Sequence, residues 1–134
     1  MSPLSTEIYW LIVTTVFTSL LWMPHIMERM LVMKPYAALR DPRHDDVPQA
    51  PWAHRAVRAH ANAFDNLIVF AALVLSLEIT GGNTATTALV AKTYFVARAA
   101  HFVVYTLAVP WLRTPMFLVG LGCQLVIAAT LLTG

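Results

Sequence analysis

Two groups of polar side chains interrupt apolar stretches of this 134-residue chain. In the first stretch, Arg58, Asn62 and Asp65 share about 60° of one face if the segment is helical, at about 100° per residue. In the second stretch the polar residues are four, three and four positions apart and again share one helix face: Tyr94, Arg98, His101 and Tyr105. A polar track on each helix predicts a pocket for a hydrophilic ligand.

We expect the two tracks to meet in an antiparallel hairpin that turns at Gly81-Gly82. The pairs at equal depth are then Asp65 with Arg98, Asn62 with His101, and Arg58 with Tyr105. The first pair would lie about 16 Å deep in the membrane, at ~1.5 Å per residue. An isolated charge at that depth costs about 2.5 kcal/mol or more. We therefore expect Asp65 and Arg98 to pair with each other, or with a partner from another subunit.

These residues also have simpler interpretations. Asp65 and Arg98 alone are equally consistent with a structural ion pair that fixes helix register. The continuation of both tracks to the cytoplasmic edge favours a ligand site. His101 alone is interpreted as a structural histidine, because no second His or Cys lies within ligand spacing on its face, and we find no metal-binding motif. Cys123 lies in an apolar context and is a poor nucleophile candidate.

A further chemical signal lies in the sequence Leu112-Arg113-Thr114-Pro115. It is typical of a helix start, with Thr114 as the N-cap and Pro115 at the first helical position. The positive helix end, the Arg113 guanidinium and the Thr114 hydroxyl would together favour an anion such as a thiolate. The alternative is that Arg113 only anchors the cytoplasmic end of a span.

Membrane-spanning helices must position these side chains. The chain is 58% hydrophobic and 12% charged, whereas a soluble domain carries roughly 25% charged residues. A span needs about 20 mostly apolar residues, and we place four spans at roughly 6–30, 55–79, 85–109 and 114–133. The sequence thus predicts an all-α integral membrane four-helix bundle, with residues 1–134 forming one domain.

Basic residues are unevenly distributed between the predicted connections. The loop between the first two spans contains Arg29, Lys34, Arg40 and Arg43, whereas no basic residue follows the Gly81-Gly82 turn until Lys92. The positive-inside rule then places the first loop in the cytoplasm and both termini outside. We interpret the loop residues His44, Asp45 and Asp46 as solvated rather than as a metal cluster. The net charge of +2 is too small and scattered to indicate nucleic-acid binding.

Taken together, these motifs resemble the MAPEG family, the membrane-associated proteins in eicosanoid and glutathione metabolism. The stretch from Trp52 to Asn66, which contains Arg58, Asn62 and Asp65, is similar to the family signature Arg-Ala-x-x-Asn-x-x-Glu. The stretch from Ala97 to Tyr105, followed by Arg113 and Thr114, is a second match. The resemblance covers most of residues 51–122.

The resemblance implies a homotrimer that binds glutathione, as co-substrate, between neighbouring subunits and from the cytoplasmic side. The residues that match the family's glutathione site are Arg58, Asn62, Asp65, Arg98, His101 and Tyr105. It further implies that Arg113 activates the thiol, with Tyr105 or Thr114 as hydrogen-bond donor. A hydrophobic substrate would arrive from the lipid. Resemblance to short bacterial members implies a bacterial inner membrane.

Two positions depart from the family pattern. Asp65 replaces the usual glutamate, and Ala61 stands where some eicosanoid-synthesising members have another arginine, so a prostaglandin-type substrate is not supported. We expect a glutathione-dependent transferase or peroxidase that acts on a hydrophobic electrophile or lipid hydroperoxide. The alternative is a non-catalytic lipid-binding or scaffolding membrane protein of the same fold. A small transporter is less favoured, because the charged tracks stop near mid-membrane.

Overall fold

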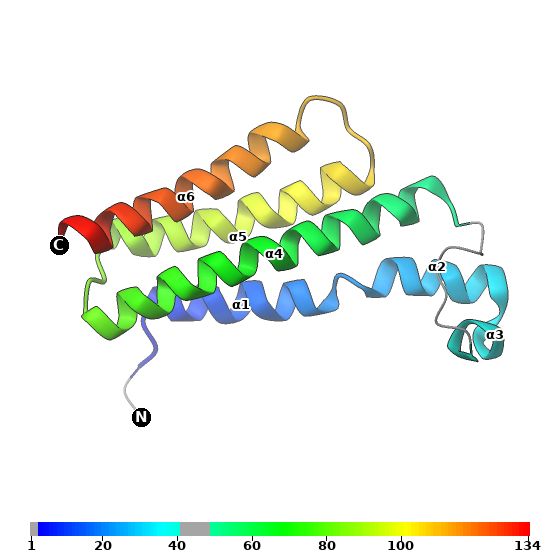
Figure 1. Cartoon of the computed structure of the whole chain (residues 1–134), viewed down its shortest axis with the longest axis horizontal. Coiled ribbons are helices and arrows are strands. Elements are labelled where there is room, and N and C mark those ends of the chain that lie inside the picture. Colours follow the sequence, from blue (N-terminus) through cyan, green and yellow to red (C-terminus); the bar gives the residue numbers. More distant parts are fainter. Residues whose placement is uncertain (1–2, 41–48) are drawn as a thin grey trace.

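The computed structural model describes residues 3–40 and 49–134, and none of these residues lies in a strand. The all-α class is therefore confirmed for the described residues. Four of the helices run side by side along the long axis of the molecule (Figure 1). The helices in chain order are α1 (Thr6–Leu20), α2 (Met23–Met33), α3 (Pro35–Arg40), α4 (Pro51–Thr80), α5 (Ala85–Thr106) and α6 (Arg113–Thr133).

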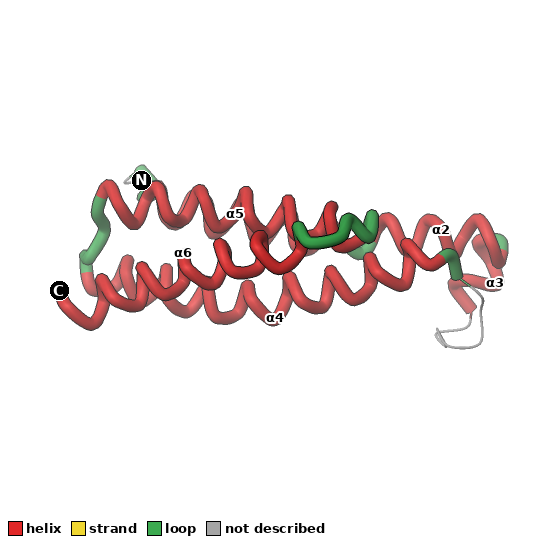
Figure 2. Tube along the Cα trace, turned by 90° about the horizontal axis from the view of Figure 1, so that it is seen from above, coloured by secondary structure: helices red, strands yellow, loops and turns green. Residues whose placement is uncertain are grey.

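Helices α4 and α5 lie at the centre of the packing. They contact each other, and each of them also contacts α1 and α6 (Figure 2). The two ends of the chain lie at the same end of the molecule as the turn between α4 and α5 (Figure 1). Helices α2 and α3 lie at the opposite end, and the connection between α5 and α6 points the same way.

The first predicted span, residues 6–30, is interrupted at Leu21 and Trp22. Pro24 lies in the first turn of α2 and has no N–H to donate to the carbonyl four residues earlier. The Leu21 N–H instead donates to the Thr18 carbonyl at 3.2 Å, which closes α1 with a tighter turn. The other spans differ from the prediction by a few residues at their ends; α4 begins at Pro51, a residue suited to the first helical position.

Three segments of the described chain are long and apolar enough to cross a membrane: Thr6–Met33, Pro51–Thr80 and Arg113–Thr133. Helix α5, the predicted third span, is not among them. It carries Lys92, Arg98 and His101, and the last two side chains are only 3% and 4% exposed. Its neighbours α1, α4 and α6 cover Arg98 and His101, so burial in protein compensates for a composition that lipid alone would not favour.

Hydrogen bonds join three helices at the end where the termini lie. Ser5 Oγ donates to Glu78 Oε2 at 2.6 Å, and Asn83 Nδ2 donates to the same oxygen at 3.0 Å. Thr87 Oγ1 donates to Oε1 of Glu7 at 2.5 Å, and the Glu7 side chain is only 2% exposed. We call Ser5, Glu7, Glu78, Asn83 and Thr87 the terminal hydrogen-bond cluster. It fixes the start of α1 against the end of α4 and the start of α5.

We predict that Thr87→Val lowers the free energy of unfolding by about 1–3 kcal/mol, because a buried carboxylate then lacks its donor. Thr87 also forms a capping box with Thr84, which the valine removes. Thermal unfolding followed by circular dichroism in detergent measures the change. The matched control is Thr93→Val, since that hydroxyl donates only to the Leu89 carbonyl of its own helix. An unchanged melting temperature for Thr87→Val would contradict the prediction.

Candidate functional site

Arg98 is the buried centre of the polar region. Its Nη2 donates to the side-chain oxygen of Asn62 at 2.5 Å and to the Asn62 carbonyl at 3.3 Å. Its Nε and Nη1 are buried and make no hydrogen bond within the described part of the chain. The guanidinium carbon lies 5.9 Å from the centre of the Phe117 ring, in cation–π range. Helices α4 and α6 thus hold the Arg98 side chain from both sides.

The predicted pairing of Asp65 with Arg98 within one chain is wrong. Arg98 bonds to Asn62, which the expected register placed beside His101, and Asp65 forms no ion pair with Arg98. Asp65 is exposed and lines a cavity between α4 and α1, beside Thr15 and Thr18 of α1. Equal depth did not bring the two charges together, because Asp65 lies about 60° around α4 from Asn62. A partner from another subunit remains a prediction.

Helix α6 contributes two residues that the sequence analysis missed. Gln124 is buried, and its Nε2 donates to the Asn66 carbonyl of α4 at 3.0 Å. Gly120 lies against Arg98, since a Cβ added there would be 3.2 Å from Arg98 Cδ. The sequence did contain a signal for this contact. Gln124 is a polar amide inside an apolar span, and Gly120 lies four residues earlier on the same helix face.

A second part of the site is a cavity of about 420 Å³ where α4 begins, α5 ends and α6 begins. Its polar lining comes from Arg55, Arg58, Tyr105 and Arg113, and we call it the arginine pocket. No acidic residue is among the residues that line it, so three guanidinium groups make it strongly positive. Arg55 Nε donates to the Thr106 carbonyl at 2.8 Å, which satisfies an otherwise unpaired carbonyl at the end of α5.

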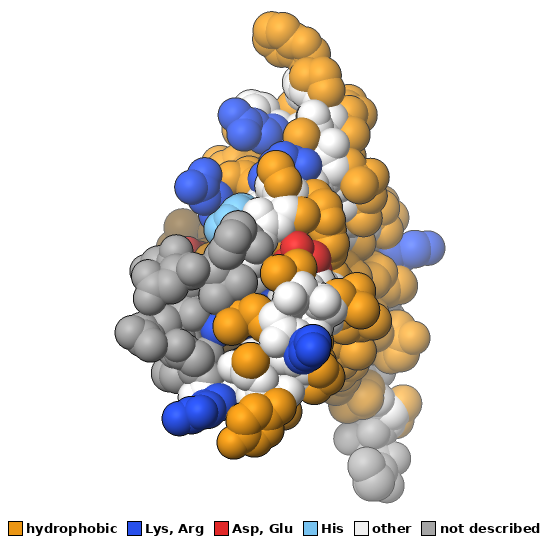
Figure 3. All heavy atoms as spheres, turned by 90° about the vertical axis from the view of Figure 1, so that its right-hand side faces the viewer, with side chains coloured by type: hydrophobic (Ala, Val, Ile, Leu, Met, Phe, Trp, Pro, Cys, Tyr) orange, Lys and Arg blue, Asp and Glu red, His pale blue; other side chains and the backbone are white. Residues whose placement is uncertain are grey.

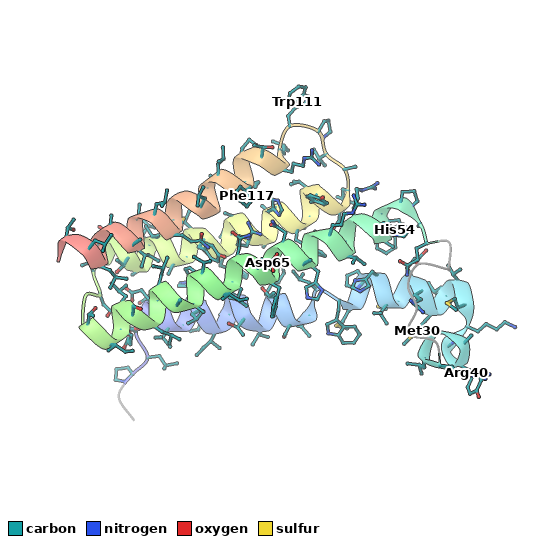
Figure 4. The ribbon with its side chains drawn as sticks, viewed as in Figure 1. Met30, Arg40, His54, Asp65, Trp111 and Phe117 are labelled. Atoms are coloured by element: carbon teal, nitrogen blue, oxygen red, sulfur yellow. The ribbon has the colours of Figure 1, made fainter. Side chains whose placement is uncertain are left out.

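The connection between α5 and α6 forms the apolar wall of the arginine pocket. Ala108, Val109, Pro110 and Trp111 line it. Ala108 and Trp111 have φ angles of +56° and +69°, a conformation that costs roughly 1–2 kcal/mol for residues with a side chain. Trp111 projects from this connection and is 88% exposed (Figure 4). A strained turn thus closes one side of a positively charged cavity.

Aromatic rings link the two parts of the site. The His101 ring lies 6.3 Å from Phe117 and 5.6 Å from Tyr105, measured between ring centres. The guanidinium carbon of Arg113 lies 5.7 Å from the centre of the Tyr105 ring. A continuous series of side chains therefore runs from buried Arg98 to the open arginine pocket. The remaining residue of the predicted α5 track, Tyr94, is buried deeper. Its ring stacks on that of Phe70, with 3.8 Å between the ring centres.

Thr114 differs from its prediction. Helix α6 begins at Arg113, and its N-cap is Leu112, with no side-chain capping bond. Thr114 is therefore not the N-cap, and Pro115 is the third helical residue, where a missing N–H costs nothing. Thr114 is exposed and does not line the arginine pocket.

The site offers chemistry for anions. Guanidinium groups bind carboxylates in a two-point geometry, and a phenol can donate a hydrogen bond to a thiolate.

Within the described residues no group of three or more His, Cys, Asp or Glu could hold a metal ion. The predicted solvated cluster of His44, Asp45 and Asp46 lies outside the described residues.

We predict that Gly120→Ala destabilises the protein by about 1–3 kcal/mol, because the added methyl group forces Arg98 to move. Gly122→Ala is the matched control, since a Cβ there meets nothing within 4 Å. That control should be neutral, or stabilising by up to about 1 kcal/mol through helix propensity. Chemical or thermal unfolding in detergent compares the two variants. Equal stability of both would show that Arg98 does not depend on the close approach of α6.

Comparisons with known proteins agree with this geometry. The model of the MAPEG family matches residues 8–133, which include every helix of the site. A comparison with curated proteins gives no match. The family match and the three membrane-length helices identify an integral membrane protein of the kind that acts in glutathione or eicosanoid metabolism. The chain belongs to the MAPEG family.

Proposed function

We propose that the protein is a glutathione-dependent membrane transferase or peroxidase that acts on a hydrophobic electrophile or a lipid hydroperoxide. The observation that carries this proposal is the arginine pocket, in which Arg55, Arg58 and Arg113 meet Tyr105 and no carboxylate is among the lining residues. Glutathione has two carboxylates and a thiol that ionises, so its charges complement this lining. Family membership supports the choice of glutathione among anionic peptides.

The proposed chemistry depends on the thiolate. Arg113 stabilises it, and Tyr105 donates a hydrogen bond to it, which together lower the thiol pKa from about 8.5 toward neutrality. In transfer, the thiolate sulfur bonds to an electrophilic carbon and the leaving group departs with its electron pair. In peroxide reduction, two glutathione thiols are oxidised to a disulfide while the hydroperoxide is reduced to an alcohol and water.

We further propose that neighbouring copies in a homotrimer complete the glutathione site. Two buried nitrogens of Arg98 make no hydrogen bond in the described chain, and the Asp65 carboxylate is exposed within a membrane-length helix. Both groups need polar partners beyond those that the described part of one chain gives them. In this proposal Asn62, Arg98 and His101 organise the inner part of the site. Helix α5 is then a fourth span, and residues 1–134 form one domain.

Charge distribution supports an orientation in the membrane. Lysine and arginine side chains surround the end of the molecule opposite the termini (Figure 3). The positive-inside rule then places the arginine pocket in the cytoplasm and both termini outside. We propose a bacterial inner membrane as the location. Cytoplasmic glutathione would then have direct access to the pocket.

A non-catalytic lipid-binding or scaffolding protein of the same fold is the second candidate. A cavity of about 600 Å³ between α1, α2 and α4 favours it. We call it the α1–α4 cavity; its walls are largely apolar, with Asp65 and His60 among the polar exceptions. Such a cavity can bind a lipid without any thiol chemistry.

The first test is glutathione binding to the detergent-purified protein, with thiolate absorbance near 240 nm followed across pH 6 to 9. We expect saturable binding and a thiol pKa below that of free glutathione. Arg113→Ala should lower turnover on the order of 100-fold, with a smaller loss of affinity, because its charge acts mainly on the thiolate. Lys92→Ala is the control, since it also removes one exposed positive charge but lies outside the pocket.

Either of two results would count against this assignment. Wild-type turnover in Arg113→Ala would show that Arg113 does not stabilise the thiolate. Absence of binding at millimolar glutathione would overturn the enzymatic proposal and favour the lipid-binding candidate.

Tyr105 and Thr114 can be distinguished as thiolate donors. Tyr105 lines the arginine pocket and Thr114 does not, so Tyr105→Phe should raise the pKa of bound glutathione more than Thr114→Ala. Absorbance titration of the two variants measures this difference. A larger shift in Thr114→Ala would assign the donor role to the threonine.

A further inference from the structure

Asp65 is a charged residue close to the midpoint of α4, a helix long and apolar enough to cross a membrane (Figure 4). Its side chain is exposed and lines the α1–α4 cavity. A carboxylate at such a depth is costly unless it has a partner, and an ionisable residue inside a membrane therefore indicates a functional site. The volume of the cavity, about 600 Å³, lies in the range of roughly 300–1,000 Å³ typical of small-molecule sites.

The lining of the α1–α4 cavity does not provide a permanent cation for this carboxylate. None of the described residues that line it is a lysine or an arginine. Two histidines line it, His25 from α2 and His60 from α4, with 6.2 Å between their ring centres. A neutral imidazole carries no charge and has one accepting nitrogen. With both imidazoles neutral, the charge of the lining is negative.

Two hydroxyl groups of α1 add hydrogen-bond acceptors to the same cavity. Thr15 Oγ1 donates to the Leu11 carbonyl at 2.8 Å, and Ser19 Oγ donates to the Val16 carbonyl at 2.7 Å. A hydroxyl has one hydrogen and two lone pairs, so each of these oxygens has used its donor within α1 and can still accept. Together with Asp65, they favour a ligand that brings several N–H donors.

Aromatic and aliphatic side chains form much of the remaining wall. Trp22 and Phe64 line the cavity, and both side chains are exposed. The face of an aromatic ring attracts a cation that lies within about 6 Å of the ring centre. Val57 and Leu67 add apolar surface on α4. A ligand for this cavity therefore combines a hydrophobic body with a positive charge.

We propose that the α1–α4 cavity binds a lipophilic amine in its protonated form, with the ammonium group on Asp65 and the hydrophobic body against Trp22 and Phe64. A primary ammonium group has three N–H donors, which match the carboxylate and hydroxyl oxygens. Its hydrogen bond to the carboxylate is charge-assisted and therefore stronger than a neutral one. The ligand thus supplies the partner that a carboxylate inside a membrane needs.

This inference goes beyond the proposed function, because it concerns a second ligand of opposite charge. The arginine pocket attracts anions, whereas the α1–α4 cavity attracts cations. No described residue lines both cavities. A donor from a neighbouring copy is compatible with the amine, since a carboxylate can accept about four hydrogen bonds.

The test is photo-crosslinking with a dodecylamine analogue that carries a diazirine in mid-chain, applied to the protein in nanodiscs of phosphatidylcholine at neutral pH. Mass spectrometry then locates the labelled residues. We expect labels on residues 15–22 and 57–67, and saturable competition by unlabelled dodecylamine. The alcohol and carboxylic-acid analogues should label these segments about tenfold less, because they lack the charge-assisted hydrogen bond to Asp65.

Substitutions separate the charge of the cavity from its shape. Asp65→Asn removes the charge at nearly constant size and should weaken competition by dodecylamine about tenfold. Asp65→Glu is the matched control, since it keeps a carboxylate and should retain most of the binding. Ala61→Trp should abolish the label because the indole fills the cavity, whereas Ala72→Trp, at an exposed position of α4 outside the lining, should preserve it. Size-exclusion profiles check that each variant is folded.

Equal labelling by the amine and alcohol probes would overturn this inference, because charge would then play no part in the binding. An unchanged amine label in both Asp65→Asn and Ala61→Trp would also overturn it. A change of oligomeric state in Asp65→Asn with an unchanged amine label would assign the carboxylate to the contact between copies alone, against the proposal. Loss of the label in Asp65→Asn with its recovery in Asp65→Glu would confirm that the carboxylate binds the amine.

Discussion

The arrangement of this protein depends on one buried cation. A guanidinium inside a membrane protein is costly unless other protein groups surround it and accept hydrogen bonds from it. Arg98 therefore requires α5 to be covered by its neighbours, and α1, α4 and α6 contact that helix. Asn62 supplies oxygen atoms from α4, and Gly120 lets α6 approach the arginine side chain. A helix that composition alone does not mark as a membrane span is thus held among three other helices.

The two ends of the molecule differ in physical character. At the end with the termini, the terminal hydrogen-bond cluster consists of short, paired contacts that leave little freedom. At the opposite end, three arginines line an open cavity beside a strained connection that contains Ala108 and Trp111. Such strain is stored at functional sites when the surrounding structure can hold it. The first end is suited to stability and the second to binding.

Three cavities of different chemistry surround the same helices. The arginine pocket is cationic, and a cavity between α1 and α5 is lined by apolar residues alone. The α1–α4 cavity is largely apolar but also contains one carboxylate, hydroxyl groups and two histidines. The cationic cavity and the purely apolar cavity lie next to each other, because Val104 lines both of them.

The helical periodicity of the sequence was sufficient to predict the all-α class, the last three long helices near their observed ends and the polar track on α5. Apolar runs and i, i+4 spacing are local properties, and the chain alone carries them. Tertiary structure decided that Asp65 faces away from Arg98 and that Gln124 bonds to α4. Depth along a hairpin can be calculated from residue numbers, but the rotation of each helix is set by packing against the others. Only that rotation decided which polar groups met.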